Sequence, residues 1–232
     1  MIVLDLYCCA GGAARGYQRA GFEVIGIDIE PRPRYCGDAF LQADAIESLT
    51  NWRDWGWTPD LIHASPPCQA GCTLTNGTNR ANGWGREHQQ LVPQTRHFLE
   101  EIGIPYVIEQ PAGHKGLIRT DLRLCMDMFP VGPPPWVMRH RDFEISGFKV
   151  GQPRHVRHRG YVRGMRHGVL RDGPYVAAYG SGGGKATIAE MQHALGIDWT
   201  TEREELTEAI PPAYTEHIGR FFAESLTGVG RL

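Results

Sequence analysis

Short apolar runs recur along the first half of the chain, and polar or amphipathic stretches separate them. Each run is five or six residues long, as expected of a buried strand. They cover residues 2–7, 22–27, 60–64 and 105–109. Apolar positions at helical spacing predict helices over residues 15–20 and, most clearly, 88–102. A further short unit ends near Asp44.

This alternation predicts an α/β fold, with a doubly wound, mostly parallel sheet and helices on both faces. Such sheets bind ligands in the crevice at the carboxyl ends of their strands. The noteworthy polar residues follow strands at that edge, and they lie between Asp5 and Gly12 and at Asp28, Asp44, Cys68 and Glu109. The sequence therefore predicts that these side chains share one site.

The pattern changes after Phe129, where a proline-rich segment leads into a basic stretch from Arg139 to Arg171. A strand over residues 175–179 and a glycine-rich segment over 180–185 are expected to follow. The remainder, residues 187–223, is predicted to be helical, with an interruption at Pro211 and Pro212.

Composition limits the interpretation. The chain has 232 residues, 41% of them hydrophobic, and a formal net charge of −2, so any argument for nucleic acid must rest on local charge. We expect no signal peptide, because the chain opens directly with a strand-like run, and no bilayer-spanning stretch of about 20 apolar residues. The six cysteines lack paired C-x-x-C spacing, which argues against structural zinc and predicts reduced thiols in the cytoplasm.

A glycine turn at Gly11 and Gly12 separates the first predicted strand from the first helix. Such a turn lets the backbone approach a ligand closely at a positive helix end. Asp28, at the end of the second strand, could bind the two hydroxyls of a ribose, and Asp44 could accept a hydrogen bond from an adenine amino group. The alternative is a tight connection with surface aspartates, with Asp5 merely capping the following helix.

The run Ser65-Pro66-Pro67-Cys68-Gln69 follows the strand over residues 60–64. Two prolines fix the backbone and direct the next side chain into the cleft, where an ionised cysteine is a strong nucleophile. A carboxyl group at an adjacent strand end could assist such a nucleophile by protonating or hydrogen-bonding the group that it attacks, and Glu109 is so placed. The alternatives are a buried inert cysteine or a metal or redox pair with Cys72.

Several motifs follow one another along the chain. They are Asp5-Leu6-Tyr7-Cys8-Cys9-Ala10-Gly11-Gly12, Pro66-Pro67-Cys68-Gln69, Glu109, Arg139-His140-Arg141 and Glu208-Ala209-Ile210-Pro211-Pro212-Ala213-Tyr214. Together they resemble the cytosine-C5 DNA methyltransferase family. The resemblance implies a Rossmann-like fold that binds S-adenosylmethionine, and a base-flipping enzyme of restriction–modification in a bacterial or phage-infected cell.

The resemblance also implies residue roles and a domain plan. Cys68 would be the nucleophile, Glu109 the carboxyl group at N3, and Arg139 and Arg141 the contacts to the cytosine O2 and a phosphate. The implied cofactor shell comprises Asp5, Tyr7, Gly11, Gly12, Asp28, Ile29, Asp44, Ala45 and Pro66. Residues 1–144 would form the cofactor-binding catalytic core, 145–185 a short basic recognition insertion, and 186–232 C-terminal helices that return to the core.

Four positions depart from the family pattern. Cys9 replaces the first glycine of the turn, and Val137 replaces a glutamine before the two arginines. Gln110 and Pro111 follow Glu109 where the family has Asn-Val, which could alter the rate or the group transferred. Glu208 replaces an asparagine before the C-terminal prolines. None of these changes removes a reacting group.

The region expected to read the target spans only about 40 residues and holds Asp172 as its sole acid. Its density of cations suits phosphate contacts with double-stranded DNA and predicts steep salt dependence of binding. Its shortness leaves little room for groove readout and predicts short or relaxed sequence specificity. The expected nucleic-acid contacts are Gln69, Arg154, Arg157, Arg159, Arg163, Arg166 and Lys185. The alternative for the whole segment is a solvated basic loop without a partner. Residues 180–185 could contact a phosphate backbone, but the favoured interpretation is a hinge between two lobes.

Other functions remain open from the sequence. The substrate could be RNA or a free nucleotide, although the many cations favour a polymer. A group other than methyl could be transferred from a modified sulfonium cofactor, or the chain could be an inactive DNA-binding homologue. Cys68 argues against an amino-group methyltransferase, which carries an aromatic residue after Ser-Pro-Pro. No obligate protein partner is implied.

Overall fold

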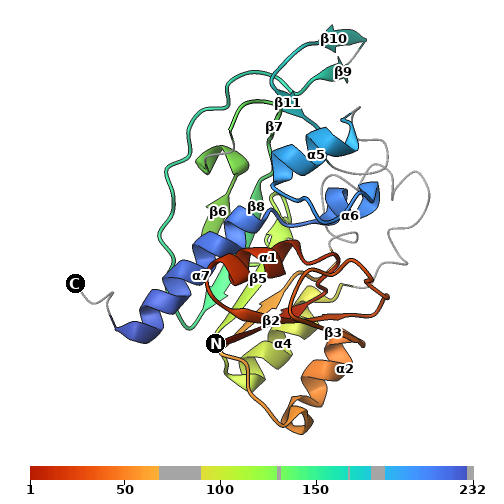
Figure 1. The fold of residues 1–232 in the computed structure, drawn as a ribbon. Coiled ribbons are helices and arrows are strands. Elements are labelled where there is room, and N and C mark those ends of the chain that lie inside the picture. Colours follow the sequence, from red (N-terminus) through yellow and green to blue (C-terminus); the bar gives the residue numbers. More distant parts are fainter. Residues whose placement is uncertain (68–89, 130–131, 167, 179–185, 229–232) are drawn as a thin grey trace.

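The computed structural model describes residues 1–67, 90–129, 132–166, 168–178 and 186–228. Its centre is a seven-stranded sheet with the order β3-β2-β1-β4-β5-β8-β6 (Figure 1). The strands are β1 (Ile2–Leu6), β2 (Glu23–Asp28), β3 (Ala39–Gln42), β4 (Leu61–Ala64), β5 (Tyr106–Pro111), β6 (Leu122–Leu124) and β8 (Arg141–Ser146). Strands β3, β2, β1, β4 and β5 pair in parallel, whereas β8 is antiparallel to both neighbours.

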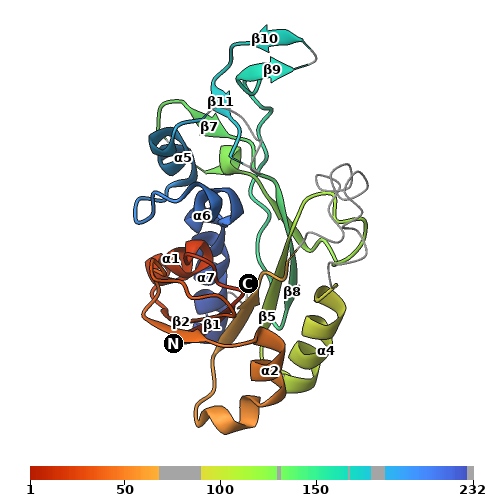
Figure 2. The same ribbon diagram turned by 90° about the vertical axis from the view of Figure 1, so that its right-hand side faces the viewer.

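Helices cover both faces of this sheet (Figures 1 and 2). One face packs against α1 (Gly12–Arg19) and α7 (Pro212–Thr227), and the other against α2 (Ala45–Thr50) and α4 (Val92–Ile102). Because side chains alternate along a strand, Val3 of β1 points to the α1 face and Leu4 to the α4 face, and both are fully buried. The predicted mostly parallel α/β sheet is confirmed.

Apart from η1 (Trp52–Trp55), a 3-10 turn between α2 and β4, the remaining described elements lie beyond the carboxyl edge of the sheet. Two small parallel strands, β7 (Trp136–Val137) and β11 (Tyr175–Val176), pair there, and β9 (Gly164–Arg166) and β10 (Val169–Arg171) form an antiparallel hairpin. In both views this hairpin lies at the opposite end of the molecule from α2 (Figures 1 and 2). Two further helices, α5 (Ile188–Leu195) and α6 (Arg203–Glu208), lie between it and α7, and η3 (Met126–Met128) is a further 3-10 turn.

The first and last helices pack directly on each other. A Cβ atom at Gly16 of α1 would lie 2.0 Å from the Thr215 hydroxyl and 2.2 Å from the Pro212 carbonyl of α7, so only glycine fits at this crossing. The same hydroxyl donates to the Ala13 carbonyl at 2.8 Å. The C-terminal helix is therefore an integral part of the core on this face.

Several boundaries differ from the sequence predictions. The first helix begins at Gly12 rather than Arg15, because Gly11 is its N-cap. The C-terminal region contains three helices, and the additional break between α5 and α6 begins at Gly196, a left-handed C-cap. Strands β6 and β8 were missed, since β6 is three residues long and β8 alternates charged with apolar positions.

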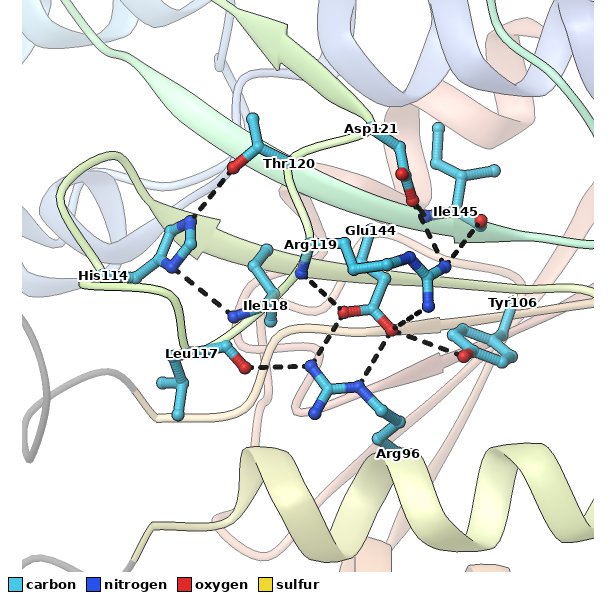
Figure 3. A network of polar contacts seen from close by, with 10 residues as sticks. All are labelled: Arg96, Tyr106, His114, Leu117, Ile118, Arg119, Thr120, Asp121, Glu144 and Ile145. Carbon is cyan, nitrogen blue, oxygen red and sulfur yellow. Dashed lines mark hydrogen bonds and ion pairs between the residues drawn. The ribbon is translucent and has the colours of Figure 1, made fainter.

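A buried carboxylate joins α4, β5 and β8 on the α4 face (Figure 3). Glu144 of β8 accepts hydrogen bonds from Arg96 at 2.7 and 2.9 Å and from the backbone amide of Arg119 at 2.9 Å. Burial raises the pKa of Glu144, but the bonds and charges of Arg96 and Arg119 outweigh it and hold that pKa below its usual value. This network fixes the segment after β5 to the edge of the sheet.

Within the described part of the chain, none of the helices combines the length and apolar character needed to cross a membrane.

Candidate active site

The turn between β1 and α1 lies at the carboxyl edge of the sheet. Tyr7 and Cys9 have φ angles of 59° and 48°, a left-handed backbone that side chains other than Asn and Asp seldom adopt. The turn is fixed to the end of β2, because the Cys9 amide donates to Asp28 at 2.9 Å and the Cys8 amide to the Ile27 carbonyl at 3.2 Å. Backbone strain of this kind is concentrated at functional sites.

The carboxylate of Asp28 is almost completely buried and already has several partners. Besides the Cys9 amide, it accepts a hydrogen bond from the Glu30 amide at 3.0 Å and forms an ion pair with Arg32 at 3.1 Å. Ile29, the next residue, is by contrast 62% exposed. The end of β2 thus offers an anchored carboxylate beside an exposed apolar side chain.

Asp44 lies at the end of the next strand unit, as the N-cap of α2. Its side chain accepts the Glu47 amide at 2.8 Å, and Ala45 begins the helix in a buried position. The hydroxyl of Tyr7 lies 2.9 Å from the Thr95 hydroxyl of α4. Burial, together with the negative charge of Asp44, raises the pKa of Tyr7 to about 12, so this phenol stays protonated.

Asp5 and His63 are neighbours in the sheet and point to its α1 face. Burial, reinforced by the charge of Asp28, raises the pKa of Asp5 to about 8. Among the described residues neither of its oxygens has a well-aligned hydrogen bond, although the Ala14 amide is close enough to lower its pKa. Burial lowers the pKa of His63 to about 3, and its nitrogens lie 3.0 Å from the hydroxyls of Tyr17 and Ser65.

The C-terminal region encloses the glycine turn. A Cβ atom at Gly12 would lie 2.3 Å from the Ile210 carbonyl, so this glycine is required by the protein's own packing. The Gly11 carbonyl accepts the Cys36 thiol at 3.1 Å. The Trp199 indole donates to the Ala10 carbonyl at 2.8 Å, a role that no motif in the sequence indicated.

Strand β4 delivers the Pro-Pro segment to the same edge. Pro66 is buried, and its carbonyl accepts a 2.7 Å hydrogen bond from the Gln110 side chain of β5. Gln110, a departure from the family pattern, therefore anchors the backbone two residues before the expected nucleophile. Cys68 and Gln69 lie outside the described residues.

Glu109 precedes Gln110 and points to the opposite face of β5. Its carboxylate forms a 2.6 Å ion pair with Nε of Arg141, and its exposed fraction is only 6%. Arg141 is opposite Pro111 in the antiparallel β5–β8 register, so the two charged residues are diagonal neighbours on one face. The structure thus brings Glu109 and Arg141 together at the end of the strand next to β4.

Arg139 is placed differently. It is buried, and its guanidinium donates to the backbone carbonyls of Ala178 at 2.5 Å and Thr207 at 2.7 Å. Its own carbonyl accepts a hydrogen bond from the Tyr214 hydroxyl of α7. Arg139 therefore has a structural role, because it joins the segment before β8 to α6 and α7.

The basic segment presents most of its cations to solvent. Arg154, Arg157 and Arg159 are exposed, and Arg159 lies over the Trp136 ring at 5.5 Å. Arg163 forms a 2.7 Å ion pair with Glu190 of α5. Arg166 belongs to β9, but its side chain is outside the described part of the structure, as is Lys185.

The hairpin of β9 and β10 also exposes large apolar side chains, which the sequence interpretation did not anticipate. Met165, Val169 and Leu170 have exposed fractions of 61%, 58% and 72%. An apolar surface interleaved with arginines is typical of an interaction surface.

The topology defines the class of fold. Five parallel strands, an antiparallel β8 inserted beside β5, and helices on both faces form the Rossmann-like fold of methyltransferases. The predicted doubly wound fold is confirmed at this level.

Two solved structures share this fold over nearly the whole chain. One is an E. coli protein provisionally described as a DNA modification methyltransferase encoded within a prophage, with a TM-score of 0.59, 14% identity, and coverage of 98% of this chain and 99% of the other. The second is the S. pombe Dnmt2 methyltransferase, with a TM-score of 0.56, 12% identity and coverage of 97% and 99%. No protein-family model matches the sequence, and no curated protein matches it. At these identities the likeness shows the fold.

Proposed function

We propose that this protein transfers a methyl group from S-adenosylmethionine to C5 of cytosine in DNA, through a covalent bond between Cys68 and C6 of the base. One observation carries the proposal: Glu109, fixed by Arg141, lies at the end of β5 beside the buried Pro66 backbone that leads to Cys68. The motifs resembling cytosine-C5 methyltransferases and the fold shared with two methyltransferases support it.

The chemistry follows from these groups. The Cys68 thiolate adds to C6 while the Glu109 carboxyl group engages N3, so that electron density reaches C5. C5 would then take the methyl group from the sulfur of the bound cofactor, with S-adenosylhomocysteine as the leaving group, and loss of the C5 proton to solvent would restore the C5–C6 double bond and release the Cys68 thiolate. The 2.6 Å ion pair with Arg141 holds the carboxyl group in one orientation throughout.

The cofactor site would lie at the carboxyl ends of β1, β2 and β3. Bound there, S-adenosylmethionine supplies an electrophilic methyl group on a cationic sulfur. The residues fit such a ligand, because Asp5 holds a buried carboxyl group that has no well-aligned hydrogen bond to any described residue, while Ile29 leaves an apolar side chain exposed beside Asp28. Asp28 and Asp44 would bind ribose and adenine, and Tyr7, Gly11, Gly12, Ala45 and Pro66 would complete the walls.

DNA would lie against the basic segment and the β9–β10 hairpin, beyond the edge that holds Glu109. The exposed cations would neutralise phosphates, and the apolar residues of the hairpin would enter a groove or support the displaced strand. The proposal includes three parts of the chain: a cofactor-binding catalytic core over residues 1–144, a basic insertion over 145–185, and C-terminal helices over 186–232 that return to the core.

The decisive assay incubates the protein with S-adenosylmethionine and a mixed-sequence duplex, then measures nucleosides by mass spectrometry. We expect 5-methylcytosine, lost in Cys68→Ser and reduced at least about 100-fold in Glu109→Gln, the scale of one general acid–base group. Glu101→Gln, an exposed carboxylate of α4, is the matched control and should keep full activity.

A second measurement isolates the covalent step. A duplex with 5-fluorocytosine should leave a denaturation-resistant complex with the protein, because fluorine cannot leave C5 as a proton does. Cys68→Ser should abolish this complex. If DNA, RNA and dCMP all remain unmodified and no complex forms, the enzymatic proposal fails. A cytosine adduct heavier than 5-methylcytosine would show that the enzyme transfers a group other than methyl.

A further inference from the structure

Four side chains that bind transition metals converge at the start of β8, where His140 stands between Arg139 and Arg141 of the proposed active site. Cys125 follows β6, His140 directly precedes β8, and His155 and His158 belong to the basic segment. One ligand atom from each residue lies within 4.8 Å of all the others. In a tetrahedral zinc site with one thiolate and three imidazoles, Zn–N near 2.0 Å and Zn–S near 2.3 Å separate the donor atoms by roughly 3.3–3.5 Å. The cluster needs only small side-chain shifts to reach that geometry.

The imidazoles already face one another as metal ligands do. Nε2 of His140 and Nε2 of His155 are 3.2 Å apart. The ring of His158 stands nearly perpendicular to both, at centroid distances of 5.2 and 4.9 Å. Cys125 adds a buried free thiol, and a soft sulfur together with imidazole nitrogens is a donor set that suits zinc.

A carboxylate orients one of these ligands from behind. Asp127 accepts a 2.5 Å hydrogen bond from Nδ1 of His158, which leaves Nε2 of that ring directed to the cluster. The same carboxylate oxygen accepts the Tyr175 hydroxyl at 2.7 Å. Carboxylate–histidine–metal relays of this kind fix the tautomer and the ring orientation of metal-bound histidines.

We propose that Cys125, His140, His155 and His158 bind one structural zinc ion, oriented by Asp127. Binding displaces the thiol proton of Cys125 to solvent, and the three histidines donate neutral nitrogen lone pairs. Four protein ligands leave no open position for substrate, which makes the site structural. The ion would fix the basic segment to β6 and β8.

The test uses the full-length protein, stripped of metal by a chelator, with Co²⁺ as the spectroscopic probe and Zn²⁺ as competitor. We expect one equivalent of Co²⁺ to give the intense visible bands of a tetrahedral site with a thiolate charge-transfer band, and Zn²⁺ to remove both. Cys125→Ser should lose the charge-transfer band.

His155 is the most informative position, because its side chain is exposed and its removal spares the core. We expect His155→Ala to weaken Zn²⁺ binding at least about 100-fold and Asp127→Asn about 10–100-fold. His97→Ala, an exposed histidine on α4, is the matched control and should bind like the parent. Zn²⁺ should raise the melting temperature of the parent and of His97→Ala but not of His155→Ala.

Equal Zn²⁺ affinity in the parent and in His155→Ala, or the weak spectrum of six-coordinate Co²⁺, would overturn the proposal. Neither measurement requires methyl transfer, so the metal site and the proposed function can fail independently.

Discussion

Two carboxyl groups are buried on opposite faces of the same sheet, Asp5 against α1 and Glu144 against α4. Glu144 receives hydrogen bonds from two arginines, which keep its pKa low and its charge fixed (Figure 3). Asp5 lies next to another acid, Asp28, and its pKa rises to about 8. Burial alone therefore does not decide the state of a carboxyl group; the charges supplied by neighbouring elements do.

The difference in partners distinguishes a structural carboxylate, Glu144, from a carboxyl group with a proposed role in cofactor binding, Asp5. The hydrogen bonds of Glu144 join α4, β8 and the segment around Arg119, and this structural role accounts for its burial. Asp5 can gain or lose a proton near neutral pH, at the edge where we propose that a cationic cofactor binds. A cation at that edge would favour the ionised form of Asp5.

The largest effect should follow from breaking the ion pair between Arg96 and Glu144. Arg96→Met removes one cation from Glu144 and leaves Arg119 as its remaining guanidinium partner, so we expect a loss of about 3 kcal/mol in the free energy of unfolding. Urea denaturation measures it. The same change at Arg220, an exposed partner of Glu216 on α7, should cost less than 1 kcal/mol. Similar losses at both positions would contradict a special role for the Glu144 network.

Asp5→Asn should change how stability depends on pH. The folded pKa of Asp5 lies above its unfolded value, so the native state binds the extra proton, and ionisation costs stability as pH rises from about 4 to about 8. Asparagine removes this loss, so the stability of the variant relative to that of the parent should rise by up to about 2.7 kcal/mol from pH 6 to pH 8.

Unfolding curves at several pH values test this, with the exposed Asp54→Asn as control. A pH-independent difference between Asp5→Asn and the parent would show that Asp5 is ionised in both states.

The smallest effect concerns an uncharged bond on the α4 face. Gln110→Met removes the donor to the Pro66 carbonyl while keeping side-chain length, and we expect a loss of about 1–2 kcal/mol. Since this bond positions the segment before Cys68, the yield of the 5-fluorocytosine complex should fall more steeply than stability does. Gln94→Met, at an exposed position of α4, should change neither quantity. Unaltered complex formation in Gln110→Met would remove the positioning role.

The sequence predicted the buried parallel strands β1, β2, β4 and β5, because they are continuous apolar runs separated by glycine and proline turns, but it missed β6 and β8. It also predicted that Asp28, Asp44 and Glu109 lie at the carboxyl edge, and the strand order places them there. Helix ends were displaced by a few residues where caps such as Gly11 and Gly196 decide the boundary.

What the sequence did not indicate depends on contacts between distant segments. Trp199 reaches the Ala10 carbonyl across 189 residues, and the pairing of Glu109 with Arg141 rests on an antiparallel register that no local pattern encodes. The four residues of the proposed zinc site come from three separate segments, so a search for C-x-x-C spacing could not find them. Only the His155-x-x-His158 pair was visible in the sequence.

The packing of α7 on α1 has a consequence for biosynthesis. The hydrogen bond from Thr215 to Ala13 spans 202 residues, and such long-range contacts form slowly. While the chain emerges from the ribosome, the part of the apolar α1 face that α7 covers stays exposed until α7 has been made. A chain that ends before α7 would therefore expose an aggregation-prone apolar surface rather than form a smaller working protein.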